Sequence, residues 1–484
     1  MLMILSLLLL IAFAVLTTAL FHFKNLIAYC LSVYLLIFAN IALNGHIAHL
    51  FSLMNQRWFF LLFESLALII AVFIWFRQGK PSLIPPIKPK EKKFSLLSCL
   101  RNPDLSLFAI LIVAALGIQI ALILVVSPNN NDSLAMHVPR TLYWLQHGNY
   151  SPWETNRIAQ LFYPVNAQLQ MLWTVLFSNS WNFLGFPQFF AQLAAALAVA
   201  GVARFLGVKP VGQIFAGLAF LTYPIIVTQS TTTQNDLIIG GLFGISLYFL
   251  YSFFDEKKRV KLILSGISIA LAFGTKLTAV FLLPGLAIIL LLALVDQKIV
   301  FKELLVWTAS LAVTFICCGL MIHIQNYQTY GNPLGAPSTV SKASQATASF
   351  RDAINQMVAS STKLTYQFID PSGLPSPLWR CGLQLKSTAA EQFFDWIAYD
   401  IEDPTVTVNN HPFSLDRVYL LQEDEAVFGF VGFLAILPGA LIAFVIGVKQ
   451  RNIYLMAPFI LYITLIFSET LFRPGWTPYQ GRYF

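Results

Sequence analysis

The segment LSLFAILIVAALGIQIALILVV at residues 105–126 leads directly into SPNNNDSLAMHVPR at residues 127–140. The first segment carries no charged side chain and is long enough to cross a bilayer as a helix, which takes about 20 apolar residues. The second segment presents an acid, an imidazole and a guanidinium at Asp132, His137 and Arg140. A span that ends in such a group predicts the mouth of a site at the membrane surface.

Apolar residues dominate the rest of the chain as well. Hydrophobic residues make up 57% of the 484 residues, charged residues make up 11%, and the mean hydropathy is +0.70. A soluble domain keeps about 25% charged residues, so this composition predicts an all-α polytopic integral membrane protein. About twelve apolar runs have roughly the length of a membrane span: Leu2–Leu20, Leu26–Leu50, Trp58–Phe76, Leu105–Val126, Phe183–Leu206, Val211–Val227, Leu237–Phe254, Leu262–Phe273 (short for a crossing), Leu277–Val295, Leu304–His323, Ala426–Val448 and Ile453–Phe472.

The start of the chain, the cysteines and the net charge all fit this class. Met1–Leu20 lacks a basic leader and an obvious cleavage site, so we expect a retained span and not a signal peptide. The five cysteines have no metal-ligand spacing and are expected to be free thiols. The net charge of +8 is scattered over short loops, which indicates membrane topology and not nucleic-acid binding.

Basic loops predict the orientation, because short Lys- and Arg-rich loops face the cytoplasm. The richest loop is Arg77–Lys93, and counting spans outward from it places five further basic loops on the same side. The opposite, non-cytoplasmic face then receives Ser127–Trp181, the turns at Thr228–Asn235 and Gly274–Lys276, the long Ile324–Glu425 segment and the tail Arg473–Phe484. This sidedness predicts a membrane-embedded site that opens to the non-cytoplasmic side.

Two acids at the ends of spans are candidate catalytic residues. Within Ser127–Trp181 an apolar stripe at i, i+4 spacing predicts an amphipathic helix in the interface, and Asp132 stands where that helix begins. Asp236 follows Asn235 at the same end of a later span. Each acid is open to a second interpretation as a helix cap or first-turn residue. A pair of carboxylates suits general-base work, and a divalent cation held by Asp132, Asp236 and His137 is left open.

Cations at the same ends of spans are candidate phosphate ligands. Lys276 lies between two apolar runs, and Arg473 and Arg482 lie in the C-terminal tail. A guanidinium suits phosphate because its planar fork donates two parallel hydrogen bonds. Snorkelling to water is the alternative explanation for Lys276.

The long outer segment adds weaker candidates. It opens at Asn326–Gly335, where Gly, Asn and Pro predict turns around Tyr330 and Asn332. Near its end, Gln422–Glu425 carries three acids, for which a solvated acidic edge is the favoured interpretation.

The order and common sidedness of these elements resemble the multi-span glycosyltransferases of the GT-C fold. The nearest subgroup is that of the bacterial protein-mannosyltransferase and aminoarabinose-transferase-like proteins, similar to glycosyltransferase family 39. The resemblance runs from about Leu105 to the C-terminus. It is carried by Asp132-Ser133 with His137-Val138-Pro139-Arg140, Gln234-Asn235-Asp236, Gly274-Thr275-Lys276, Asn326 with Tyr330-Gly331-Asn332-Pro333, and Gln480-Gly481-Arg482-Tyr483.

This resemblance implies transfer of a sugar from a polyprenyl-phosphate-linked donor to an acceptor hydroxyl or amine. The acceptor is a glycan, lipid or protein, and the transfer takes place on the periplasmic or exterior face of the bacterial inner membrane. Asp132 matches the acid that acts as base on the acceptor, with Asp236 as a second catalytic acid, and the anomeric carbon is inverted. The donor-phosphate ligands would be Lys276, Arg473 and Arg482. The substrate-binding residues would be His137, Arg140, Asn235, Tyr330 and Asn332. Relatives usually carry further spans after the Arg-Tyr pair, so we expect either a short family member or a shortened chain.

The predicted organisation has five parts: an N-terminal three-span unit at 1–76, a basic Pro/Lys-rich linker at 77–104, a GT-C-like module at 105–323 with its first outer loop at 127–182, a large outer loop at 324–425 and a C-terminal part at 426–484. A transporter or flippase of lipid-linked sugars is the alternative function. It predicts symmetric repeats with charges at mid-span in both halves. A non-catalytic scaffold whose outer loop binds a partner is a third hypothesis, and it predicts no loss of chemistry when Asp132 is changed.

Overall fold

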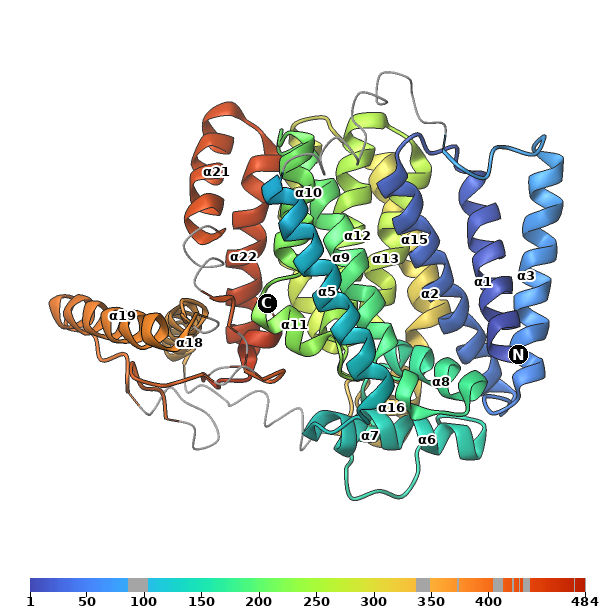
Figure 1. Cartoon of the computed structure of the whole chain (residues 1–484), viewed down its shortest axis with the longest axis horizontal. Coiled ribbons are helices and arrows are strands. Elements are labelled where there is room, and N and C mark those ends of the chain that lie inside the picture. Colours follow the sequence, from blue (N-terminus) through green and yellow to red (C-terminus); the bar gives the residue numbers. More distant parts are fainter. Residues whose placement is uncertain are drawn as a thin grey trace. The chain divides into compact units, whose positions relative to one another are not determined.

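A computed structural model describes residues 1–85, 103–336, 349–371, 374–403, 412–419, 422–425, 427–429, 436–473 and 475–483. Within these ranges the chain forms α-helices joined by short turns and contains no β-strand (Figure 1). This confirms the predicted all-α polytopic class. Most of the basic linker, including Lys88–Lys93 and Cys99, lies outside the described residues, as do parts of Ala426–Val448 and of the large outer loop.

The described chain divides into two compact units. The first unit contains Met1–Leu221, Ser230–Leu277 and Val300–Ala336, and the second contains Thr222–Gln229, Thr278–Ile299 and Pro337–Phe484. Helices α1, α2 and α3 belong to the same unit as α5 and the helices that follow it. The five-part organisation from the sequence stays a prediction.

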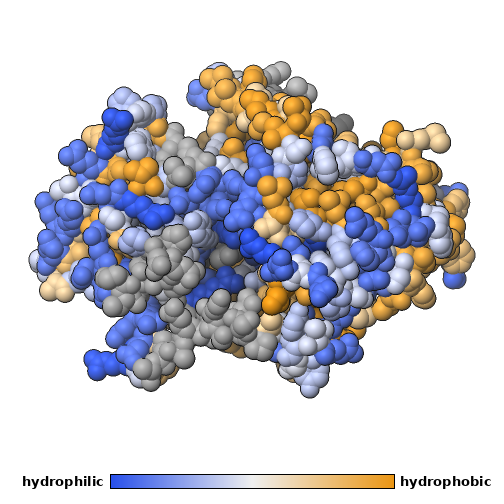
Figure 2. Space-filling view, turned by 90° about the horizontal axis from the view of Figure 1, so that it is seen from below, coloured by the Kyte–Doolittle hydropathy of each residue, from blue (hydrophilic) through white to orange (hydrophobic). Residues whose placement is uncertain are grey.

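The first unit consists of long apolar helices with short helices gathered at one end (Figure 1). The long helices are α1 Leu2–Ala19, α2 Leu26–Leu50, α3 Arg57–Arg77, α5 Pro103–Val125, α9 Phe186–Phe205, α12 Asp236–Glu256, α13 Arg259–Phe273 and α15 Phe301–Cys318, and the shorter apolar helix α10 Pro210–Phe220 accompanies them. The short ones are α6 Val138–His147, α7 Ala159–Phe162, α8 Asn166–Ser178 and α16 Leu320–Tyr330. Seen from the end where α6 and α7 lie, both hydrophilic and hydrophobic side chains reach the surface (Figure 2).

The second unit contains α11 Pro224–Gln229, α14 Leu283–Val295, α18 Phe350–Phe368, α19 Ser376–Trp396, α21 Leu437–Gln450 and α22 Ile453–Phe472. Helix α14 packs closely on α22, because a Cβ on Gly285 would lie 2.5 Å from Thr464 Oγ1. A buried cluster around Trp476 joins α18 and α22 to the tail, with Phe413 edge-on to Trp476 at 4.9 Å.

Nine of the described helices are long and apolar enough to cross a membrane, so the predicted count of twelve is not reproduced. The run Val211–Val227 is divided before Pro224, since proline disfavours a helical conformation in the residue that precedes it. The run Leu304–His323 is divided at Gly319, which has φ −149° and separates α15 from α16. The short run at Leu262–Phe273 forms the 15-residue helix α13.

A buried polar contact joins the N-terminal helices to α8. The carboxylate of Glu64, 1% exposed on α3, accepts hydrogen bonds from Ser6 Oγ of α1 at 2.7 and 2.8 Å and from Trp173 Nε1 of α8 at 3.2 Å. Trp173 also belongs to the apolar cluster between α2, α3 and α8. A polar group removed from water needs such partners to avoid its desolvation cost.

Replacing Glu64 by alanine should lower the free energy of unfolding by about 1–3 kcal/mol, because Ser6 and Trp173 lose a buried acceptor. Glu64→Gln keeps an acceptor oxygen and should be milder. The thermal midpoint of the detergent-solubilised protein measures the effect, with Ile69→Ala, at a site 62% exposed on the same helix, as the control. Equal midpoints for Glu64→Ala and the wild type would contradict this role.

Candidate functional site

Asp132 does not cap the helix in which it stands. The backbone N–H of Ser133 donates to Asn130 Oδ1 at 2.7 Å, so Asn130 provides the cap. Asp132 has helical dihedral angles (φ −64°, ψ −38°), and its side chain makes no cap hydrogen bond. The turn that follows, Ser133–His137, is a π-helix, a rare local form that occurs frequently at functional sites. The capping interpretation therefore does not account for the Asp132 carboxylate.

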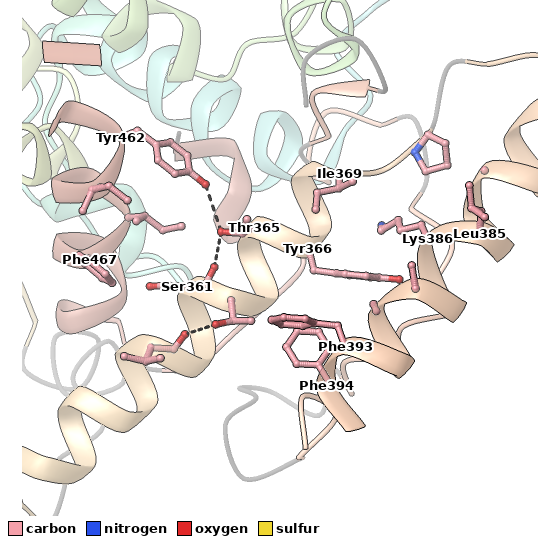
Figure 3. Close-up of a pocket in the computed structure, with 18 residues that line it drawn as sticks. Ser361, Thr365, Tyr366, Ile369, Leu385, Lys386, Phe393, Phe394, Tyr462 and Phe467 are labelled. Atoms are coloured by element: carbon pink, nitrogen blue, oxygen red, sulfur yellow. Dashed lines mark hydrogen bonds between the residues drawn. The ribbon is translucent and has the colours of Figure 1, made fainter. Parts of the chain in front are cut away.

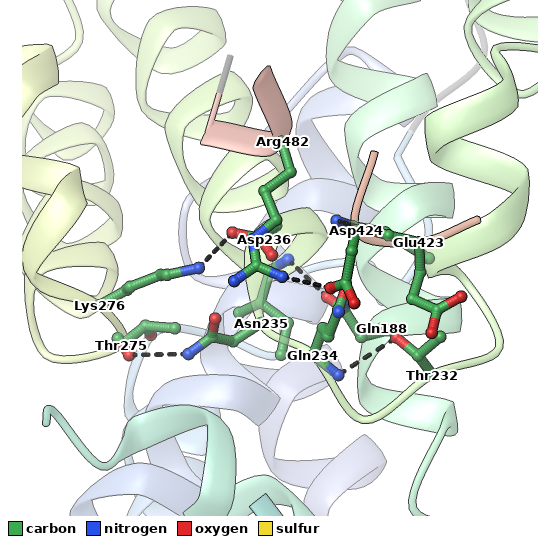
Figure 4. Close-up of polar contacts among 12 residues, drawn as sticks. Gln188, Thr232, Gln234, Asn235, Asp236, Thr275, Lys276, Glu423, Asp424 and Arg482 are labelled. Atoms are coloured by element: carbon green, nitrogen blue, oxygen red, sulfur yellow. Dashed lines mark hydrogen bonds and ion pairs between the residues drawn. The ribbon is translucent and has the colours of Figure 1, made fainter. Parts of the chain in front are cut away.

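Hydrogen bonds tie three distant segments of the first unit together. Thr233 Oγ1 donates to Ser133 Oγ at 2.6 Å, which joins the first outer loop to the turn before α12. Asn235 Nδ2 donates to the carbonyl of Thr275 at 3.3 Å, which joins that turn to the end of α13 (Figure 4). The residues next to these contacts are Asp132, Asp236 and Lys276, so the three predicted motifs lie in one cluster.

Asp236 and Lys276 form an ion pair within this cluster (Figure 4). The Asp236 side chain is 6% exposed and the Lys276 side chain is 18% exposed. Asp236 lies in the first turn of α12, where the helix dipole favours a negative charge. The carboxylate therefore holds the ammonium at the end of α13 while part of the lysine stays accessible.

His137 is buried beside the same charges. Its Nδ1 lies 2.6 Å from Gln168 Nε2, which donates to it, so the proton of the neutral ring resides on Nε2. Burial lowers the pKa of His137 to about 4, against the opposing effect of Asp132. Lys276 and Arg140 lower this pKa further, whereas Asp236 raises it. The imidazole is neutral near pH 7 and feels charges from all three motifs.

Arg140 is buried and contacts the backbone of the segment before α8. It is 1% exposed and donates to the carbonyls of Pro164, at 3.1 Å, and Tyr163. Its guanidinium also lies 4.8 Å from the centre of the Trp144 ring. These contacts fix the entry to α8, on which Gln168 stands.

Below the cluster, Asn166 and His46 hold the turn that carries Lys276. The backbone N–H of Asn166 donates to the carbonyl of Gly274 at 2.9 Å, and its Nδ2 donates to that of Leu271 at 3.3 Å. Its Oδ1 lies 3.0 Å from His46 Nε2 of α2, whose Nδ1 is 2.8 Å from the Tyr150 hydroxyl. Sequence reasoning missed both residues, and the available signal was a histidine and an asparagine embedded in otherwise apolar stretches.

Two predicted substrate ligands lie in a neighbouring turn of the first unit. Tyr330 ends α16, and Asn332 Oδ1 accepts from the N–H of Leu334 at 2.9 Å. Asn326, buried on α16, donates to the carbonyls of Phe162 and Pro333. These hydrogen bonds shape the turn, and they are separate from those that join Asp132, Asp236 and Lys276.

The predicted arginines belong to the second unit. Arg482 Nη1 pairs with Asp424 Oδ1 at 2.5 Å (Figure 4). Arg473 follows α22, and its guanidinium lies 5.9 Å from the centre of the Phe281 ring. The acids near Gln422–Glu425 are not a merely solvated edge, because Glu425 is 5% exposed and pairs with Arg417 at 3.0 Å.

The part of the chain that the structure describes contains no group of three or more His, Cys, Asp or Glu side chains placed to hold a metal ion. The divalent cation on Asp132, His137 and Asp236 therefore stays a hypothesis from the sequence.

A comparison with protein families bears on the segment that holds most of this cluster. Residues 163–323 match the dolichyl-phosphate-mannose-protein mannosyltransferase family. This confirms the predicted resemblance to GT-C glycosyltransferases. The match supports, at a general level, a membrane glycosyltransferase that uses a polyprenyl-phosphate-linked sugar donor. No curated protein and no solved structure matches the chain significantly.

The matched segment covers about a third of the chain. It includes Asn166 and Gln168 as well as Asn235, Asp236 and Lys276. Asp132 precedes it, and Arg473 and Arg482 follow it. The family match therefore covers the ion pair and its support, and the roles of the residues outside it are proposals.

Gly274→Ala should displace the turn that carries Lys276. A Cβ there would lie 2.2 Å from Asn166 Nδ2 and 2.4 Å from the Cys318 carbonyl, both too close for real contacts. We expect a loss of about 1–3 kcal/mol in unfolding free energy, together with reduced sugar transfer. Thermal melting and a transfer assay measure both effects. Gly240→Ala is the matched control, since a Cβ there meets nothing within 4 Å. Identical behaviour of the two variants would refute the tight packing at Gly274.

His137 should make the protein less stable as the pH falls below 6.5. The unfolded chain takes up a proton at the ordinary histidine pKa of about 6.5, whereas the folded ring does so only near 4. The cost at pH 5 is about 2 kcal/mol. The thermal midpoint should therefore fall less between pH 7 and pH 5 in His137→Gln than in the wild type. His147→Gln, at an exposed site on α6, should behave like the wild type.

Proposed function

We propose that this protein transfers a sugar from a polyprenyl-phosphate-linked donor to an acceptor hydroxyl or amine on the non-cytoplasmic face of a bacterial inner membrane. The observation that carries the proposal is the cluster of Asp132, Asp236 and Lys276, whose three separate segments are joined by the Thr233–Ser133 and Asn235–Thr275 hydrogen bonds. The family match over residues 163–323 supports the donor class.

Asp132 is the general base in this proposal. Its carboxylate is only partly exposed and does not cap the helix. It takes the proton of the acceptor O–H or N–H while the acceptor atom forms a bond to the anomeric carbon. The bond from that carbon to the phosphate oxygen breaks on the opposite side, so the configuration is inverted and polyprenyl phosphate leaves.

Lys276 stabilises the departing phosphate. Charge develops on the phosphate oxygen as the glycosidic bond breaks, and a fixed cation lowers the energy of that state. Asp236 holds the ammonium in place, and Asn166 and Asn235 fix the turn behind it. Arg473 and Arg482 remain proposed phosphate ligands on the evidence of the sequence.

His137 contributes a neutral N–H to the site. Because Gln168 occupies Nδ1, the ring proton on Nε2 is available to donate to a substrate oxygen. With a pKa of about 4, the ring is neutral near pH 7. His137 is therefore a binding residue in this proposal, and Asp132 is the group that moves the proton.

Asp132→Asn should lower sugar transfer by about 10²- to 10⁴-fold, the usual contribution of a general base. The measurement is transfer of radiolabelled sugar from a panel of polyprenyl-phosphate donors by membranes that contain the protein. Glu154→Gln, an exposed acid in the same loop, is the matched control and should retain activity.

The outcomes separate the competing functions. Normal transfer by Asp132→Asn would remove Asp132 as the base while leaving the activity in place. Absence of transfer by the wild type across the donor panel, with movement of lipid-linked sugar between the leaflets of vesicles, would favour the transporter instead.

A further inference from the structure

A pocket in the second unit is separate from the residues of the proposed reaction. It has a volume of about 710 Å³ and is lined by α18, α19 and the half of α22 that leads to Arg473 (Figure 3). That volume falls within the range of about 300–1,000 Å³ that is typical of ligand sites. Most of the lining is apolar, with Ile466 and Phe467 on α22 and Phe393 and Phe394 on α19.

The hydroxyl groups in the lining already have partners in the protein. Thr365 bonds to the Ser361 carbonyl at 2.8 Å and lies 3.3 Å from the Tyr462 hydroxyl. Tyr366 donates to the Leu415 carbonyl at 2.7 Å. Thr362 and Ser361 bond to Val358 and Thr470. Their hydroxyl protons are therefore already used within the protein, so the acceptor oxygens of a peptide or a sugar would find no hydroxyl donor in this lining, at a cost in free energy. A hydrocarbon chain brings no such oxygens.

One charged pair marks the far side of the pocket from Phe467 (Figure 3). Lys386, whose side chain is 8% exposed, has its Nζ 3.7 Å from Asp370 Oδ2 and 3.9 Å from the centre of the Tyr366 ring. The cation is therefore held at the edge of the apolar lining, where the polar end of an amphiphile would lie.

The elements around the pocket are suited to a bilayer. Helix α22 is long and apolar enough to cross the membrane, and α19 runs across its direction (Figure 1). Leu385 of the lining is 73% exposed and Phe393 is 52% exposed. An amphipathic helix with exposed apolar residues of this size is typical of the membrane interface, so a lipid is the expected neighbour of this surface.

We propose that this pocket binds an acyl chain of a bilayer phospholipid, with the polar end of the lipid at Lys386. The chain lies between α18, α19 and α22 and covers apolar side chains that would otherwise line an open cavity. None of the lining residues is among those proposed for the sugar transfer, Arg473 and Arg482 included.

The test is photo-crosslinking in nanodiscs of phosphatidylethanolamine and phosphatidylglycerol, doped with phosphatidylethanolamine that carries a diazirine near the end of one acyl chain. Peptide mass spectrometry of the full chain should find labels on lining residues of α18, α19 and α22. Ala389→Phe, which fills the pocket, should lower that labelling at least about fivefold, while labels on α5 stay unchanged. Thr388→Phe, at an exposed neighbour outside the lining, should label like the wild type.

Three results would overturn the proposal: absence of labels on the lining, equal labelling of Ala389→Phe and the wild type, or labelling by a diazirine-bearing prenyl phosphate but not by the phospholipid. The last result would assign the pocket to a prenyl chain. Thermal melting shows whether each variant is folded, and Val358→Trp provides a second filled pocket if Ala389→Phe is not.

Discussion

The hydrogen bonds of Asn166 support the whole arrangement at the end of α13. Asn166 has no exposed surface; its backbone N–H donates to the Gly274 carbonyl, and its side-chain amide bonds to the Leu271 carbonyl and the ring of His46. Those carbonyls are among the last of a helix and lack partners within it. Asn166 supplies a partner to each, and Thr275 Oγ1 adds a second one to the Leu271 carbonyl at 2.8 Å, so the turn that carries Lys276 is held where the chain leaves α13. The acid that pairs with Lys276 comes from α12, so the ion pair joins this turn to a second helix.

Hydrogen bonds of this kind allow an apolar protein to keep charged side chains at the ends of its helices. Within lipid, the backbone of an all-α protein can satisfy its hydrogen bonds only in helices. Irregular turns and ionisable groups are therefore restricted to helix ends or to places surrounded by protein. The first unit places α6, α7 and α8 over such ends, and their buried side chains supply the hydrogen bonds that water would otherwise provide. The neutral His137 and the shielded Asp236 are consequences of that burial.

The class of the protein and most of its long helices could be predicted, because uncharged runs of bilayer length have few alternatives. The divided runs could not, since Pro224 and Gly319 interrupt helices without lowering the mean hydropathy. The motifs around Asp132, Asp236 and Lys276 were recognisable by their position at the ends of spans. His46, Asn166 and Gln168 were not, because a polar residue within an apolar run shows its role only when its partner is known. The sequence alone leaves Asp132 open to explanation as a helix cap, whereas the structure shows that Asn130 is the cap.

The π-helical turn at Ser133–His137 has a consequence for how this loop tolerates change in length. Such a turn holds one more residue than an α-helical turn over the same rise. Removing one residue from it would let the segment relax into a regular α-helix, and each residue of an α-helix advances by about 100°. Residues before the turn, Asp132 among them, would then rotate by about that angle relative to α6. The extra residue therefore sets the direction of the Asp132 side chain relative to α6, and a deletion in this turn would change that direction without changing Asp132 itself.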